Sequence, residues 1–168
     1  VFFFFLLRDK ITELLPRMKK LKHKETEIEF TEGVTELVQE SRTHGIGGEE
    51  LTQNDEYNNR LDFLYRLADI SPRSAVLESF RVVESAAAKK IARLYPELET
   101  QNIKAPFHLQ KMLKDEVLSK NEFYQFDQLR KLRNEAAHAE EFDVRGMPVE
   151  SYVALALSLA SKLESENQ

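Results

Sequence analysis

Apolar residues in the second two thirds of the chain recur every three or four positions, which is the spacing of amphipathic helices. The pattern predicts five helices, which begin near residues 54, 71, 106, 121 and 149. Ser71 followed by Pro72 is a strong start signal, because serine caps a helix and proline suits its first position. Pro96 and the turn FDVRGMP end two of these helices.

The last of these segments, VESYVALALSLASKLE, is apolar around most of its circumference. A helix of this kind is buried centrally or lies at a subunit interface. The connections between the helices are short enough for neighbouring helices to run antiparallel. The sequence therefore predicts an all-α fold, an up-and-down bundle of about five helices over residues 54–168.

The chain opens with VFFFFLL, which is followed by the basic segment RDKITELLPRMKKLKHK. Seven apolar residues are fewer than the roughly 20 that cross a bilayer. Basic residues that flank a span favour the cytoplasmic side. We expect residues 1–24 to be the end of a transmembrane helix, whose beginning is absent, and a basic juxtamembrane helix. The bundle would then lie on the cytoplasmic side of the inner membrane. The alternative is a buried N-terminal helix of a soluble protein, with its phenylalanines in an oligomer interface.

Residues 25–53 follow a different pattern. In ETEIEFTE, Ile28 and Phe30 alternate with glutamates, which is typical of a short strand. Residues 34–39 then suggest a brief helix. The following SRTHGIGGEELTQND holds three of the five glycines and indicates a flexible linker before the bundle.

Composition and charge limit the kinds of catalytic and binding site that the chain can form. The chain has no cysteine, which excludes disulfides, thiolate metal sites and a cysteine nucleophile. The four histidines lack metal-ligand spacing, so we expect no metal and no cofactor. Between Arg8 and Lys24, seven basic residues stand against two acidic ones; this segment carries +5 of a net charge of -5 and leaves -10 elsewhere. An acidic body predicts that any contact with RNA is local.

The segment LRKLRNEAAHAEEF combines two helical faces. At about 100° per residue, one face should point to the core, and it consists of Leu129, Leu132, Ala136 and Ala139. A second arc mixes aromatic, small and polar residues, as a subunit interface or cleft does; it consists of Phe123, Phe126, Arg130, Asn134, Ala137 and His138, with Arg133 at its flank.

The sequence R-N-x-x-x-H near the end of a bundle helix, after F-x-x-L-R-x-L-R, resembles the signature of the HEPN superfamily (higher eukaryote and prokaryote nucleotide-binding domains). The branch it resembles most is one of unknown function, found in bacterial membrane-linked and defence-associated proteins. The segment SPRSAVLESFRVVESAAAKKI, with Arg81 and Glu84, also resembles the second helix of that branch. The resemblance covers about residues 54–164.

The resemblance implies a dimer in which two such motifs meet across a cleft and cleave RNA without metal, the ribose 2′-hydroxyl attacking the adjacent phosphate. Arg133 would stabilise charge on the phosphorane, His138 would act as general acid or base, and Asn134 would orient the phosphate or the imidazole. Histidine titrates near neutrality and guanidinium fits phosphate, so these roles are chemically sensible. We assign substrate contacts to Arg130, Arg81 and Glu84.

The leading hypothesis is thus a membrane-tethered, cytoplasmic HEPN-like homodimer or higher oligomer that cleaves RNA in stress or phage defence. One alternative is a non-catalytic module that dimerises, or binds a nucleotide or protein, and signals to a membrane partner. In such a module, Arg133 would pair with Glu84 or a nearby acid. His138 would cap the end of the helix, where a partial positive charge is favourable. A filament or scaffold built from the N-terminal segment is a third reading.

Overall fold

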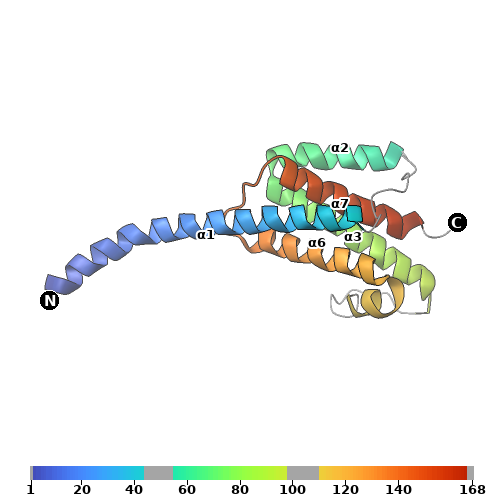
Figure 1. The fold of residues 1–168 in the computed structure, drawn as a ribbon, viewed down its shortest axis with the longest axis horizontal. Helices are drawn as coiled ribbons and strands as arrows, with labels where there is room; N and C mark the ends of the chain where they lie inside the picture. The colour runs from blue at the N-terminus through green and yellow to red at the C-terminus, as the bar shows by residue number, and fades with distance from the viewer. Residues whose placement is uncertain (1, 44–54, 98–109, 166–168) are drawn as a thin grey trace.

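A computed structural model of the chain describes residues 2–43, 55–97 and 110–165, with side chains in the first helix described from Lys20 onward except His23. Within these ranges it contains helices and no strand, which confirms the all-α class. The helices are α1 (Phe2–Thr43), α2 (Asp55–Ile70), α3 (Pro72–Leu94), the short π-helical η1 (Leu113–Val117), α6 (Lys120–His138) and α7 (Met147–Ser165). They form a helical bundle from which α1 projects (Figure 1).

The strand predicted for Glu25–Glu32 is wrong, because these residues belong to α1, one continuous helix of 42 residues. The predicted boundary at Lys24 and the brief helix at residues 34–39 also fall inside it, whereas most of the predicted linker, residues 44–54, lies outside the described residues. A lone strand has no partner for its backbone. A helix instead places Phe30, Val34 and Leu37 on one face, and all three are buried.

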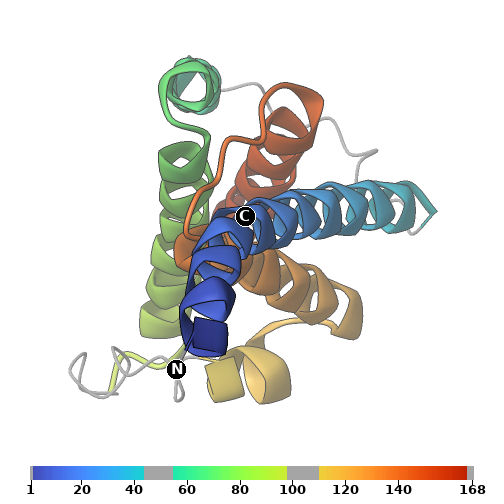
Figure 2. The same cartoon turned by 90° about the vertical axis from the view of Figure 1, so that its left-hand side faces the viewer.

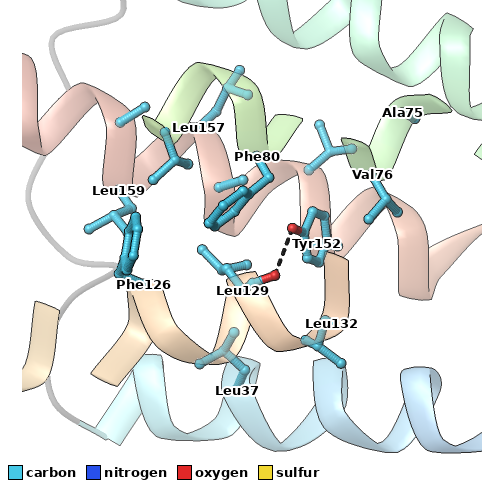
Figure 3. Close-up of a cluster of buried hydrophobic side chains, with 14 of the residues drawn as sticks. Leu37, Ala75, Val76, Phe80, Phe126, Leu129, Leu132, Tyr152, Leu157 and Leu159 are labelled. Atoms are coloured by element: carbon cyan, nitrogen blue, oxygen red, sulfur yellow. Dashed lines mark hydrogen bonds between the residues drawn. The ribbon is translucent and has the colours of Figure 1, made fainter. Parts of the chain in front are cut away.

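The centre of the bundle is α7, which contacts α1, α2, α3 and α6. This position explains why its sequence is apolar nearly all round. Figure 3 shows Tyr152 of α7 close to Phe80 of α3 and Leu129 of α6. The Tyr152 hydroxyl donates a hydrogen bond to the Leu129 carbonyl at 2.9 Å, so the phenol is satisfied inside the core.

Two helix starts follow recognisable capping rules. The Ser71 side chain accepts a hydrogen bond from the Ser74 backbone N–H, and Pro72 follows at the first helical position, as predicted. Before α6, Ser119 and Glu122 form a reciprocal capping box, which places the helix start at Lys120. The predicted start of a helix at Pro106 lies outside the described residues.

The second half of α1 is an integral part of the bundle. Phe30 is fully buried and contacts the rings of Phe142 and Tyr152, with centroids 5.0 and 5.8 Å away. Gly33 lies so close to α6 that a Cβ atom at this position would stand 2.7 Å from Leu132 Cδ2. The first half of α1 extends beyond the other helices (Figure 1), and it points toward the viewer in Figure 2.

The contact between α1 and α6 also carries acidic groups. Burial, together with the charge of Glu29, raises the pKa of Glu135. A hydrogen bond with Glu40 raises the pKa of Tyr124 to about 12, with burial adding to the effect. These groups make the α1–α6 contact partly polar.

Within residues 2–43, 55–97 and 110–165, no helix is both long and apolar enough to cross a membrane.

Candidate functional site

The R-N-x-x-x-H motif lies in the last two turns of α6, as predicted. Leu129, Leu132 and Ala136 are buried, as predicted for the core face. Ala139, assigned to the same face, is only partly buried and follows the helix as its C-terminal cap residue. The second arc lies only partly on the surface of the bundle. Phe126, assigned to it from the sequence, is 3% exposed and packs 5.4 Å from the Phe80 ring inside the bundle.

Arg133 contacts two side chains of the neighbouring helix α3. Its Nη2 donates to Glu84 Oε1 at 3.1 Å, and its guanidinium lies 4.9 Å from the centre of the Phe80 ring. Glu84 and Phe80 both belong to α3. Arg133 thereby fastens α6 to α3 through an ion pair and a cation–π contact. Pairing of Arg133 with Glu84 was one of the alternatives that the sequence left open.

The charges of this pair act on the buried Tyr152. Burial raises the pKa of Tyr152 well above its ordinary value, the charge of Arg133 lowers it, and the charge of Glu84 raises it. The phenol therefore stays protonated and serves as a hydrogen-bond donor in the core.

Asn134 and His138 are four residues apart on α6, so they project from the same side of the helix. Asn134 is partly buried and His138 is exposed. Ala139, not His138, is the C-terminal cap residue, and its N–H bonds to the Glu135 carbonyl. His138 therefore ends the helix as an accessible imidazole beside the partial negative charge of the helix terminus.

Arg73 is a residue near the motif that sequence reasoning missed. Its Nη2 donates to the carbonyl oxygen of Ala139 at 2.7 Å and more weakly to that of Glu140 at 3.4 Å. The guanidinium thus satisfies carbonyl groups just beyond the end of α6, next to His138. No local pattern in the sequence marks this role, because the residues joined are 66 positions apart.

Arg130, predicted to contact substrate, is engaged within its own helix. Its Nε and Nη2 donate to Asp127 Oδ1 at 3.2 and 2.8 Å, and Lys131 Nζ lies 3.0 Å from Asp127 Oδ2. Partial burial raises the pKa of Asp127, but the hydrogen bonds from the two cations outweigh this and hold it below its ordinary value. Asp127 therefore competes with any phosphate for both cations.

Arg81 lies apart from the motif. Its Nε donates to Glu78 Oε2 at 2.8 Å and its Nη2 to Glu78 Oε1 at 2.6 Å, and its side chain is 68% exposed. Arg81 lines a shallow cavity of about 160 Å³ among α2, α3 and α7. The structure brings Glu84 to Arg133 but leaves Arg81 on the side of α3 that faces this cavity.

In the part of the chain that the structure describes, no group of three or more histidine, aspartate or glutamate side chains could hold a metal ion. Comparisons of the chain with protein-family models, with curated proteins and with solved structures find no match.

Proposed function

We propose that the chain is a non-catalytic module that rigidly couples a membrane-anchored N-terminus to a cytoplasmic, HEPN-like up-and-down bundle. The observation that carries this proposal is the continuity of α1 from Phe2 to Thr43. Its second half is buried in the core through Phe30, Val34 and Leu37. Because the helix has no break, a displacement at its N-terminal end moves the bundle with it.

The anchor at the inner membrane is supported by the sequence VFFFFLL and the seven basic residues that follow it. Each lysine or arginine near an anionic lipid surface contributes ~1 kcal/mol to binding. Lys20, Lys22 and Lys24 are exposed on the projecting part of α1, as such a contact requires. The acidic remainder of the chain would be repelled by the same surface.

Reversing the charge of Lys20, Lys22 and Lys24 should release the full chain from anionic vesicles. Three lysines at ~1 kcal/mol each correspond to a loss of at least about 100-fold in affinity. Flotation with vesicles that contain phosphatidylserine measures the bound fraction. The matched control is the same reversal at Lys111, Lys114 and Lys120, which are exposed on the bundle and should leave flotation unchanged. A wild-type chain that stays behind while the vesicles float would contradict the proposal.

A second candidate function is metal-independent cleavage of RNA by a homodimer. The observation that favours it is the pair Asn134 and His138, side by side on α6 with an accessible imidazole. The imidazole would transfer protons while Arg133 stabilises the pentacovalent phosphate. Arg133 would first have to exchange Glu84 for the phosphate, which is why we rank this candidate second.

Incubation of the full chain with single-stranded RNA separates the two candidates. We expect no cleavage, either by the wild type or by the double variant Arg133→Ala, His138→Ala. Cleavage by the wild type that the double variant lacks would establish the nuclease instead. Arg133→Lys is a useful third sample, because it keeps the positive charge and loses the bidentate geometry.

A further inference from the structure

The sequence of α1 carries a seven-residue repeat of apolar residues between Phe4 and Ile28. When the positions of the repeat are lettered a to g from Phe4, apolar residues occupy seven of the eight a and d positions. The a positions hold Phe4, Ile11 and Met18, and the d positions hold Leu7, Leu14, Leu21 and Ile28. Glu25 is the exception. Alternate steps of three and four residues within one helix are the signature of a coiled coil.

The side chains described on this stripe face away from the bundle. Leu21 is 69% exposed and Ile28 is 48% exposed, whereas Phe30 is fully buried. Two residues along a helix correspond to about 200°, so Ile28 and Phe30 lie on nearly opposite faces. The bundle therefore covers the face of α1 that carries Phe30, whereas Leu21 and Ile28 are exposed on another face of the same helix. The backbone of α1 before Lys20 projects beyond the other helices (Figure 1).

We propose that this stripe is the seam of a parallel, two-stranded coiled coil between two copies of the chain. Leucine stands at three of the four d positions, and the β-branched Ile11 stands at an a position. This combination favours two strands over three or four. Pro16 falls at an f position, on the side away from the seam, where the hydrogen bond that it cannot donate leaves the contact intact.

The charges that flank the seam select the parallel orientation. In a parallel pair, each g residue faces the e residue of the next heptad on the other helix. Lys24 then faces the partner's Glu29, Lys10 faces Leu15, and only Arg17 and Lys22 bring like charges together. In an antiparallel pair, g would face g and e would face e, and all three g positions, Lys10, Arg17 and Lys24, are basic.

A parallel pair places both N-termini at one end and both bundles at the other. The inference deepens the proposed function and rests on it, since two chains anchored in the same membrane present their α1 helices side by side and in register. It also names the partner that the proposed module binds first, which is a second copy of itself.

The absence of native cysteine allows a direct test with single-cysteine variants of the full chain. Leu21→Cys places a thiol in the seam, and Lys20→Cys places one at an exposed c position beside it. Under mild oxidation, Leu21→Cys should form disulfide-linked dimers at least ten times faster than Lys20→Cys. Equal rates for the two variants would overturn the parallel seam.

The variant Leu21→Asp, Ile28→Asp measures what the seam contributes to assembly. Light scattering should show its mass falling from twice the chain mass of 19.6 kDa to 19.6 kDa. Thermal unfolding of the bundle should not change, because both side chains are exposed in the monomer. The variant Lys20→Asp should stay dimeric.

Three results would overturn the inference: a wild-type chain that is monomeric, a double variant that stays dimeric through the bundle, or a double variant that loses vesicle binding with its mass unchanged. The last would assign the stripe to lipid. Flotation of the wild type with anionic vesicles would still uphold the proposed membrane coupling in the first two cases.

Discussion

Replacing Phe30 by alanine should lower the free energy of unfolding by about 3–5 kcal/mol, the usual cost of removing a buried phenylalanine side chain. Phe30 is fully buried between Phe142 and Tyr152 and joins α1 to α7. For a chain of this size, the loss corresponds to a fall in melting temperature of roughly 6 to 20 °C. Urea and thermal unfolding followed by circular dichroism measure it.

Phe63→Ala is the matched control for Phe30→Ala, because it deletes the same side chain from a site on α2 that is 53% exposed. It should cost less than about 1 kcal/mol. Equal stability of Phe30→Ala and the wild type would mean that α1 does not belong to the bundle. This would favour the division of the chain that the sequence suggested, with residues 25–53 outside the folded domain.

Replacing Gln125 by leucine should stabilise the protein by about 1–3 kcal/mol, the cost of leaving a buried polar group without a hydrogen bond. Gln125 lies in the buried face of α6 and is 2% exposed. Neither its Nε2 nor its Oε1 has a hydrogen-bond partner among the residues that the structure describes. Leucine has a similar size and carries no polar atom to satisfy. The midpoint of urea unfolding measures the gain.

Gln128→Leu is the control for Gln125→Leu, because Gln128 lies on the same helix and is only partly buried. The free energy of unfolding of the Gln128→Leu variant should stay within about 0.5 kcal/mol of that of the wild type. If Gln125→Leu instead destabilises the chain, the amide must form hydrogen bonds in solution that the structure does not show.

Much of the bundle could be predicted from local patterns. The Ser71–Pro72 start is observed as a cap and first helical residue. The helix predicted over about residues 121–139 is observed as Lys120–His138. These boundaries are predictable because they are encoded by residues within a few positions of each other.

The alternation of Ile28 and Phe30 with glutamates has the period of a strand, yet the segment is helical and places these two side chains on nearly opposite faces of α1. The decision depends on whether a hydrogen-bonding partner strand exists, and this is not a local property. In the structure, Phe30 packs against Phe142, 112 positions further along the chain. Burial against a distant loop made the helix the better solution for this segment.

For the candidate site, the sequence placed Arg133, Asn134 and His138 correctly on the last turns of one helix. It left open whether Arg133 was available for a ligand. The answer required knowing that α3 lies beside α6 with Glu84 and Phe80 facing Arg133. Arg81, only three residues from Glu84, turns to Glu78 instead, a choice that no spacing rule decides.

The sequence alone therefore determined the helical class, the ends of α3 and α6, and the residue types of the motif, because capping and periodicity act over a single turn of backbone. The tertiary structure decided that α1 completes the core, that Arg133 is held by α3, and that Leu21 and Ile28 are left exposed. These outcomes depend on which distant faces meet, and only the packing of the whole bundle specifies that.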